Sequence, residues 1–185
     1  MANIKRLGFG QVEPNHLSAQ RTGQIYAQLP ANKDITQLEN GQFVKYDYAN
    51  GEVNFTGAGE WMMVFNEVKL YDDRWRESYK DYAMQAKDFT PGSEIVHDGL
   101  GNFKGQMTPR LFKINIGDIY TTNCLESAGA RGVETTMAKY AAEDVLKINA
   151  NGFLSKTGTS DMQFQVVKVY TMPDGQPAVK VMRIK

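Results

Sequence analysis

The sequence predicts a mainly β protein: an antiparallel small barrel or sandwich of short strands and hairpins, with at most one or two short helices. The strongest signal is the stretch 164–184, where two alternating β-branched arms flank a turn in which Pro173 presets one φ and Gly175 accepts a positive one. Ahead of it, two shorter apolar segments flank a turn at 149–152 that is rich in residues tolerating left-handed backbone. Turn signals recur at regular spacing with little helical periodicity and delimit about nine short strands, a pattern typical of barrels and sandwiches.

A third hairpin is predicted near the start of this β region. Residues 42–48 alternate between apolar and polar side chains, and a turn at Asn50 and Gly51 leads into a second arm at 53–55. Successive side chains of a strand point to opposite faces, so one set is expected to face the core and the other a half-polar outer surface. The core-facing set is Val44, Tyr46 and Tyr48, and the outer set is Phe43, Lys45 and Asp47.

Two further strand regions lie in the middle of the chain. Residues 60–71 contain an apolar run that suits a strand covered on both faces. Residues 109–122 predict a strand, a turn at Gly117 and Asp118, and another strand.

The remaining segments are less regular. Residues 72–84 fit a short amphipathic helix, and an aromatic-rich loop or edge segment fits them nearly as well. Glycine and proline predict a long exposed loop at about 89–107, and residues 135–143 are expected to hold a helical turn. Together with the hairpins, these segments form one expected β-rich domain at 38–185.

The first 37 residues are predicted to form an extended N-terminal arm. Their apolar residues keep no sustained period, so the segment is not expected to bury a continuous face of its own. Residues 1–33 also carry four basic side chains against one acidic one. A partly ordered terminus fits this pattern, and so does an arm that becomes ordered in a groove of a neighbouring subunit. The proposed contact residues of the arm are Ile4, Lys5, Arg6, Leu7, Phe9, Val12, Leu17, Arg21, Ile25, Tyr26 and Leu29.

Composition limits the classes of function. The 21 basic and 21 acidic residues cancel, which argues against a protein that works mainly by wrapping nucleic acid or lying on anionic lipid. The single cysteine, Cys124, excludes an intrachain disulfide and is expected to be a small buried hydrophobe. The N-terminus does not resemble a secretory signal, and the longest apolar run, 61–65, is far short of the roughly 20 residues that cross a bilayer. A soluble protein is expected.

No pattern predicts a catalytic, metal or cofactor site. The glycine pairs fail the spacing of a phosphate-binding loop, and the two histidines, His16 and His97, lie far apart in sequence. The carboxylates Asp72, Asp73 and Glu77 are interleaved with basic residues, which favours a solvated face over a cation site. The sequence therefore favours a non-enzymatic protein without a cofactor.

Several stretches together resemble small structural proteins of tailed bacteriophage heads, of the capsid decoration, cement or head-fibre-base type. The stretches are 40–53, 59–67, 117–122 and 166–180, together with the N-terminal segment. The resemblance implies a non-enzymatic β module on the outside of the capsid, assembled in the host cytoplasm, which binds the major capsid protein and neighbouring copies of itself. It implies no membrane partner, and it argues against a nucleic-acid partner.

Two alternatives remain open at this point. Another virion position, such as a head-to-tail connector or a tail-tube component, would use the same kind of barrel. A small barrel that binds single-stranded nucleic acid or glycan through exposed aromatic rings would also be compatible with nine Tyr, nine Phe and two Trp, although strand interiors account for most of these rings more simply.

Overall fold

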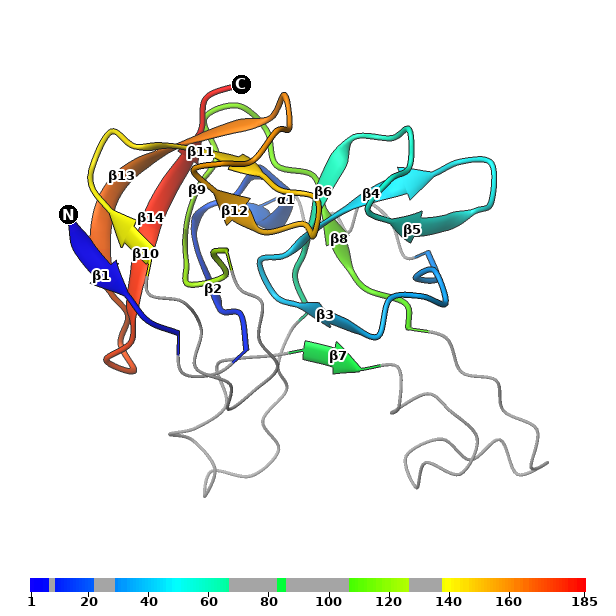
Figure 1. Ribbon diagram of the computed structural model, residues 1–185, viewed down its shortest axis with the longest axis horizontal. Helices are drawn as coiled ribbons and strands as arrows, with labels where there is room; N and C mark the ends of the chain where they lie inside the picture. Colours follow the sequence, from blue (N-terminus) through cyan, green and yellow to red (C-terminus); the bar gives the residue numbers. More distant parts are fainter. Residues whose placement is uncertain (7–8, 22–28, 67–82, 86–106, 127–137) are drawn as a thin grey trace, which may run out of the picture.

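The computed structural model describes residues 1–6, 9–21, 29–66, 83–85, 107–126 and 138–185. The described part is mainly β and antiparallel, which confirms the predicted fold class (Figure 1). A single helical turn, α1 (Ser18–Arg21), interrupts the strands. The strands are β1 (Ala2–Ile4), β2 (Val12–His16), β3 (Gln37–Glu39), β4 (Phe43–Asp47), β5 (Glu52–Asn54), β6 (Trp61–Val64), β7 (Ala83–Gln85), β8 (Leu111–Phe112), β9 (Ile119–Thr122), β10 (Ala138–Tyr140), β11 (Val145–Ile148), β12 (Leu154–Ser155), β13 (Gln163–Thr171) and β14 (Pro177–Arg183).

Four sheets organise these strands. The largest has six strands in the order β12-β11-β13-β14-β9-β2, and the next has four in the order β5-β4-β6-β8. Two-stranded sheets, β1-β10 and β3-β7, complete the set. Figure 1 shows the six-stranded and four-stranded sheets on opposite sides of the molecule, with β3 and β7 below.

The predicted hairpins are present. β13 and β14 pair around a turn in which Gly175 has φ +83° and donates its N–H to the carbonyl of Met172 at 2.8 Å. β11 and β12 pair around Gly152, which has φ +79°, and β4 pairs with β5 around Gly51, which has φ +66°. In each case the positive φ falls on glycine, where it costs no steric strain.

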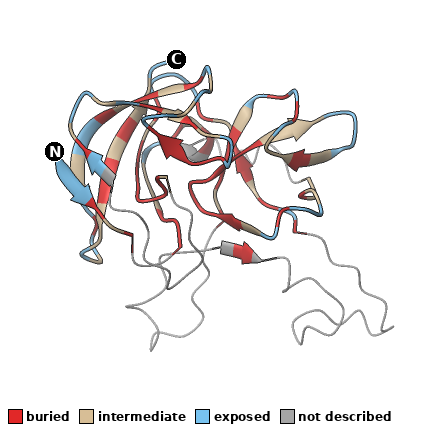
Figure 2. Ribbon diagram, in the orientation of Figure 1, coloured by how far each residue is buried: buried red, intermediate tan, exposed pale blue. Residues whose placement is uncertain are grey.

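The four-stranded sheet is covered on both faces, as predicted for the stretch around β6. Consecutive residues of β6 alternate between two cores: Met63 packs in the core of the six-stranded sheet, while Met62 and Val64 pack in a second core. Figure 2 shows burial running through the strands of both sheets. The prediction that Phe43 lies on a half-polar outer face of β4 is wrong, because Phe43 is fully buried against the six-stranded sheet. Tyr48, expected in the core, is 65% exposed because it lies past the end of β4.

Two other predictions change in detail. Residues 138–140 form β10 and not part of a helical turn, because β10 pairs with β1. Residues 109–122 do contain a strand, a turn and a strand, with φ +90° at Gly117, but the two strands enter different sheets: β8 pairs with β6, whereas β9 pairs with β14 and β2. The chain therefore crosses between the two sheets at this turn. In the undecided segment 72–84, residues 83 and 84 belong to β7, which pairs with β3, so they are strand and not helix. Residues 72–82 and loop residues 89–106 lie outside the described residues.

The N-terminal segment is part of the body. β1 pairs with β10, and β2 forms an edge of the six-stranded sheet through its pairing with β9. The prediction of an extended arm is wrong for β1 and β2, because their backbone groups pair with strands of the same chain. Strands of three and five residues joined by loops also explain why no sustained period is visible in this segment.

Candidate functional site

The proposed contact residues of the N-terminus whose burial the structure describes lie mostly inside the monomer. Ile4 and Leu17 are 3% and 1% exposed in the core of the six-stranded sheet, and Val12 packs against that core. Phe9 is buried, and Leu29 packs against the second core. Lys5 is half-buried, and Arg21 lies in α1. Leu7, Ile25 and Tyr26 lie outside the described residues.

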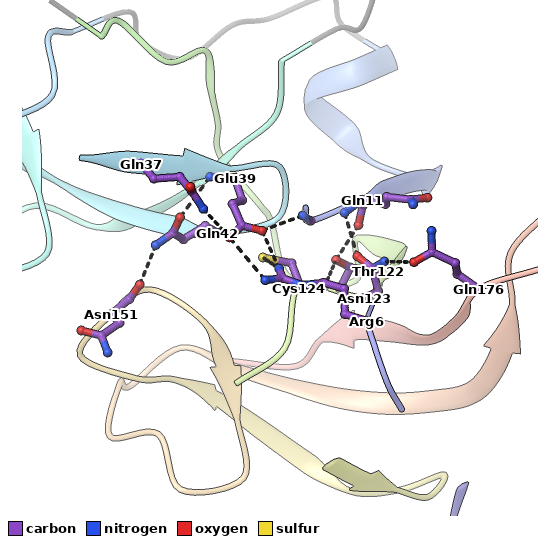
Figure 3. Close-up of polar contacts among 11 residues, drawn as sticks. Arg6, Gln11, Gln37, Glu39, Gln42, Thr122, Asn123, Cys124, Asn151 and Gln176 are labelled. Carbon is purple, nitrogen blue, oxygen red and sulfur yellow. Dashed lines mark hydrogen bonds and ion pairs between the residues drawn. The ribbon is translucent and has the colours of Figure 1, made fainter. Parts of the chain in front are cut away.

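Arg6 forms the centre of a buried polar network that anchors this segment (Figure 3). Its Nη1 donates to Glu39 Oε2 at 2.5 Å and its Nη2 donates to Glu39 Oε1 at 3.3 Å. The Gly10 N–H and the Gln37 side-chain amide also donate to the Glu39 carboxylate, at 2.6 and 2.9 Å. A buried carboxylate needs this number of donors, because an unpaired buried charge is strongly unfavourable.

The same network continues to both hairpins of the six-stranded sheet. Gln11 donates its backbone N–H to Asn123 Oδ1 at 2.8 Å, and the Asn123 amide donates to Gln176 in the β13–β14 turn at 3.3 Å. On the other side, the Gln42 side chain donates to the carbonyl of Asn151 in the β11–β12 turn at 2.8 Å. This network, called the polar belt below, therefore joins β3, the N-terminal segment and both hairpin turns. The N-terminal polar groups thus stabilise the fold of the monomer.

Cys124 lies within this belt and is fully buried. Its Sγ lies 3.9 Å from Arg6 Nη1. Burial raises the pKa of the Cys124 thiol, and the Glu39 charge raises it further. Because the thiolate is the reactive form, Cys124 is a packed side chain in the folded protein, as expected from sequence, and has no features of a nucleophile.

A pocket of about 660 Å³ opens between the two large sheets. Trp61 and Lys45, directly opposite each other on β6 and β4, line one side. Residues 148–150 and 159–162, which include Ile148 and Met162, line the other. The volume falls in the range of small-molecule sites, and the lining combines apolar side chains with a larger share of polar ones.

Charged groups surround this pocket. Glu60 receives two cations, with Arg183 Nη1 at 3.0 Å and Lys113 Nζ at 3.1 Å. Lys45 Nζ lies 5.3 Å from the centroid of the Trp61 ring, a cation–π contact. Sequence reasoning misses this site because the alternation of residues 42–48 places Lys45 on a half-polar outer face, and the apolar run 61–65 places Trp61 in a strand covered on both faces.

The outer face of the six-stranded sheet is a second exposed feature. Val145 on β11 and Val167 on β13 are 42% and 44% exposed. On the neighbouring pair, Lys168 lies directly opposite Lys180, and Lys180 Nζ is 5.3 Å from the centroid of the Tyr170 ring. Apolar and basic groups therefore share this face.

The other candidate catalytic or metal-binding residues form no cluster among the residues that the structure describes. His16 is exposed on β2, while His97 and the carboxylates of Asp72, Asp73 and Glu77 lie outside the described residues. Among the described residues, no group of three or more His, Cys, Asp or Glu side chains converges as a metal site. No helix in the described ranges has the length and apolar character needed to cross a membrane.

No family model, curated protein or solved structure matches the chain. A functional assignment therefore depends on the two features described above, the outer face of the six-stranded sheet and the pocket between the sheets.

Proposed function

We infer that this chain is a non-enzymatic structural protein of a bacteriophage virion that binds the outside of the capsid shell. The resemblance of its hairpins to phage head proteins suggests this class. Because the described N-terminal contact residues are largely used inside the monomer, the outer face of β11, β13 and β14 takes the place of the arm as the proposed contact with the major capsid protein.

The observation that carries this proposal is the pair of lysines on that face. Lys168 and Lys180 are direct cross-strand partners, and like charges placed opposite each other destabilise a sheet. Within the described residues neither lysine is in an ion pair. The same cross-strand row continues through Thr121 to Glu13 on β2, two strands from Lys180. Two strand spacings place Glu13 about 10 Å from Lys180, close to one Debye length. The charge of Glu13 therefore only weakly offsets the repulsion between the two lysines.

A partner with an acidic surface would remove this unfavourable charge pairing. Its carboxylates would neutralise Lys168 and Lys180, and its apolar groups would cover Val145 and Val167. Such a contact is small for one copy, but copies bound side by side on a symmetric shell gain from effective concentration and from contacts with one another.

The test is co-sedimentation of the purified full chain with assembled shells of its phage. Wild-type protein is expected to pellet with the shells at a fixed ratio to the capsid subunit. Combined Lys168→Glu and Lys180→Glu substitution should abolish pelleting, because the face then repels an acidic surface. Lys33→Glu, which changes an exposed lysine outside the six-stranded sheet, is the control and should pellet like the wild type.

Two results would overturn the proposal. Wild-type protein that stays in the supernatant at every shell concentration would remove capsid binding. Pelleting that persists unchanged in the double glutamate variant would remove this face as the contact. Rings of the purified protein in electron micrographs, without shell binding, would favour the connector or tail-tube position.

A further inference from the structure

The pocket between the two large sheets has walls that are fixed by backbone contacts. On the β4–β6 side, Gly59 donates its N–H to the carbonyl of Tyr46 at 2.9 Å, and a Cβ at Gly59 would lie 2.6 Å from Tyr46 Cβ. On the β11 side, Ser160 Oγ accepts the Ile148 N–H and donates to the Met162 carbonyl, both at 2.8 Å. A ligand would therefore meet a shape that already exists, so little ordering cost accompanies binding.

Some of the polar groups around the pocket are already occupied. Glu60 holds Arg183 and Lys113, and the Arg183 guanidinium also donates to the backbone carbonyl of Ile114. Ser160 uses its hydroxyl for the two backbone bonds that shape the loop. These groups build the pocket and have little capacity left for a ligand.

Five other lining residues keep unused polar capacity. Lys45 and Lys185 are in no ion pair with any residue that the structure describes. Lys185 is exposed, whereas Lys45 is half-buried and its ammonium lies over Trp61. Asp161 and the Thr159 hydroxyl likewise have no hydrogen-bond partner within the described ranges. Asn149 Oδ1 already accepts two backbone N–H groups, which leaves its Nδ2 as a donor for a ligand.

We propose that this pocket binds a sugar that carries a carboxylate. The carboxylate would pair with Lys45, since a half-buried cation without a carboxylate partner is the group in the pocket that most needs an anion. The sugar hydroxyls would donate to Asp161 and accept from Asn149 Nδ2, while the C–H surface of the ring would contact Trp61, Ile148 and Met162. In a virion protein such a site would recognise acidic glycan outside the capsid, but the assignment of the site depends only on the pocket.

Titration calorimetry of the full chain with single compounds tests this assignment. The probes are D-glucuronate and N-acetylneuraminate as acidic sugars, methyl glucoside as the neutral sugar, benzoate as a carboxylate without hydroxyls, and phenylalanine as a zwitterion that could use Lys45 and Asp161 together. At least one acidic sugar is expected to bind, and the three other compounds are expected to bind at least about tenfold more weakly, since each lacks part of the complementary set.

Lys45→Met is the informative variant, because methionine keeps an apolar stem over Trp61 and removes the charge. It should weaken the binding of the acidic sugar by about tenfold or more and leave the affinity for methyl glucoside unchanged. Lys139→Met, which removes an exposed lysine on β10, is the matched control and should bind like the wild type. An unchanged melting temperature in each variant separates a lost contact from a lost fold.

The proposal fails if the wild-type protein binds no acidic sugar, if Lys45→Met binds it as tightly as wild type, or if benzoate or phenylalanine is the tightest ligand. These outcomes are independent of shell binding, because Lys45 and the lysines of the outer face lie on different sheets.

Discussion

Arg6 Nη1 lies 2.5 Å from Glu39 Oε2, and both side chains are at most 3% exposed. The pair connects the loop after β1 to β3 (Figure 3). The fold thus depends on a polar contact between residues 33 positions apart, in addition to its two apolar cores.

Removing one partner of this pair should destabilise the protein severely. Arg6→Met leaves the Glu39 carboxylate buried without its cation, a loss of about 3–5 kcal/mol in the free energy of unfolding. Combined Arg6→Met and Glu39→Met substitution should recover part of that loss, because no charge then remains buried. Urea denaturation at constant m-value measures both changes, and a double variant as unstable as the single one would contradict this account.

The stability contributed by Glu39 should depend on pH. Burial raises the pKa of the Glu39 carboxyl above its ordinary value of 4.5, although the Arg6 charge and the Gly10 N–H oppose this shift. A raised pKa means that the folded protein keeps the proton to a higher pH than the unfolded chain does. The contribution is therefore complete below the ordinary pKa and is lost as the pH rises through the raised pKa.

Comparison with Glu39→Gln isolates this effect. The free energy of unfolding of the wild type relative to this variant is expected to fall as the pH rises from about 4 to about 8, since glutamine does not titrate. Urea denaturation at a series of pH values gives the difference directly. A difference that stays flat, or that grows with pH, would show that the Arg6 charge outweighs burial.

Gly152 should be less replaceable than Gly175, although both have positive φ. Gly152 has φ +79°, and a Cβ there would lie 2.0 Å from the Phe43 carbonyl oxygen, while its own carbonyl accepts the Phe43 N–H at 2.7 Å. Gly175 has φ +83°, and a Cβ there would meet nothing within 4 Å. Gly175→Ala should therefore cost only the left-handed backbone penalty of about 1–2 kcal/mol.

Gly152→Ala should cost more than this, because the β11–β12 turn must also move away from β4. Thermal or urea unfolding of the two variants side by side measures the difference. Equal losses would mean that the contact between the turn and Phe43 adds nothing to stability.

The hairpins could be predicted from sequence because their causes are local. Alternation of apolar and polar side chains and a glycine at the turn are enough to predict the hairpin of β13 and β14. Local turn signals likewise predict the hairpins of β11 with β12 and of β4 with β5. The layering could not be predicted, since Phe43 and Val44 look equally apolar and only the position of the second core determines that both are buried. Three-residue strands such as β1 and β10 carry too little pattern to be recognised before their partner is known.

The candidate site was harder to predict for the same reason. The Arg6–Glu39 pair and the pocket around Lys45 and Trp61 join segments that only the crossing between the sheets brings together. A single arginine in an aperiodic segment indicates exposure, and nothing local to it indicates a buried carboxylate as its partner. The turn at Pro173 and Gly175 predicts the approximate register of β13 and β14. The irregularity between Val166 and Lys168 shifts that register along the strands.

Cys124 should report on the integrity of the Arg6 network. The thiol is fully buried and burial raises its pKa, so a thiol reagent such as Ellman's reagent can react only after the surrounding structure opens. With an opening free energy of about 5 kcal/mol or more, labelling of the folded protein is expected to be at least about a thousandfold slower than labelling in urea. Arg6→Met should accelerate labelling by about a hundredfold or more, because it destabilises the segment that covers the thiol, whereas Lys139→Met should leave the rate unchanged. Rapid stoichiometric labelling of the folded wild-type protein would show that the belt around Cys124 is open to solvent.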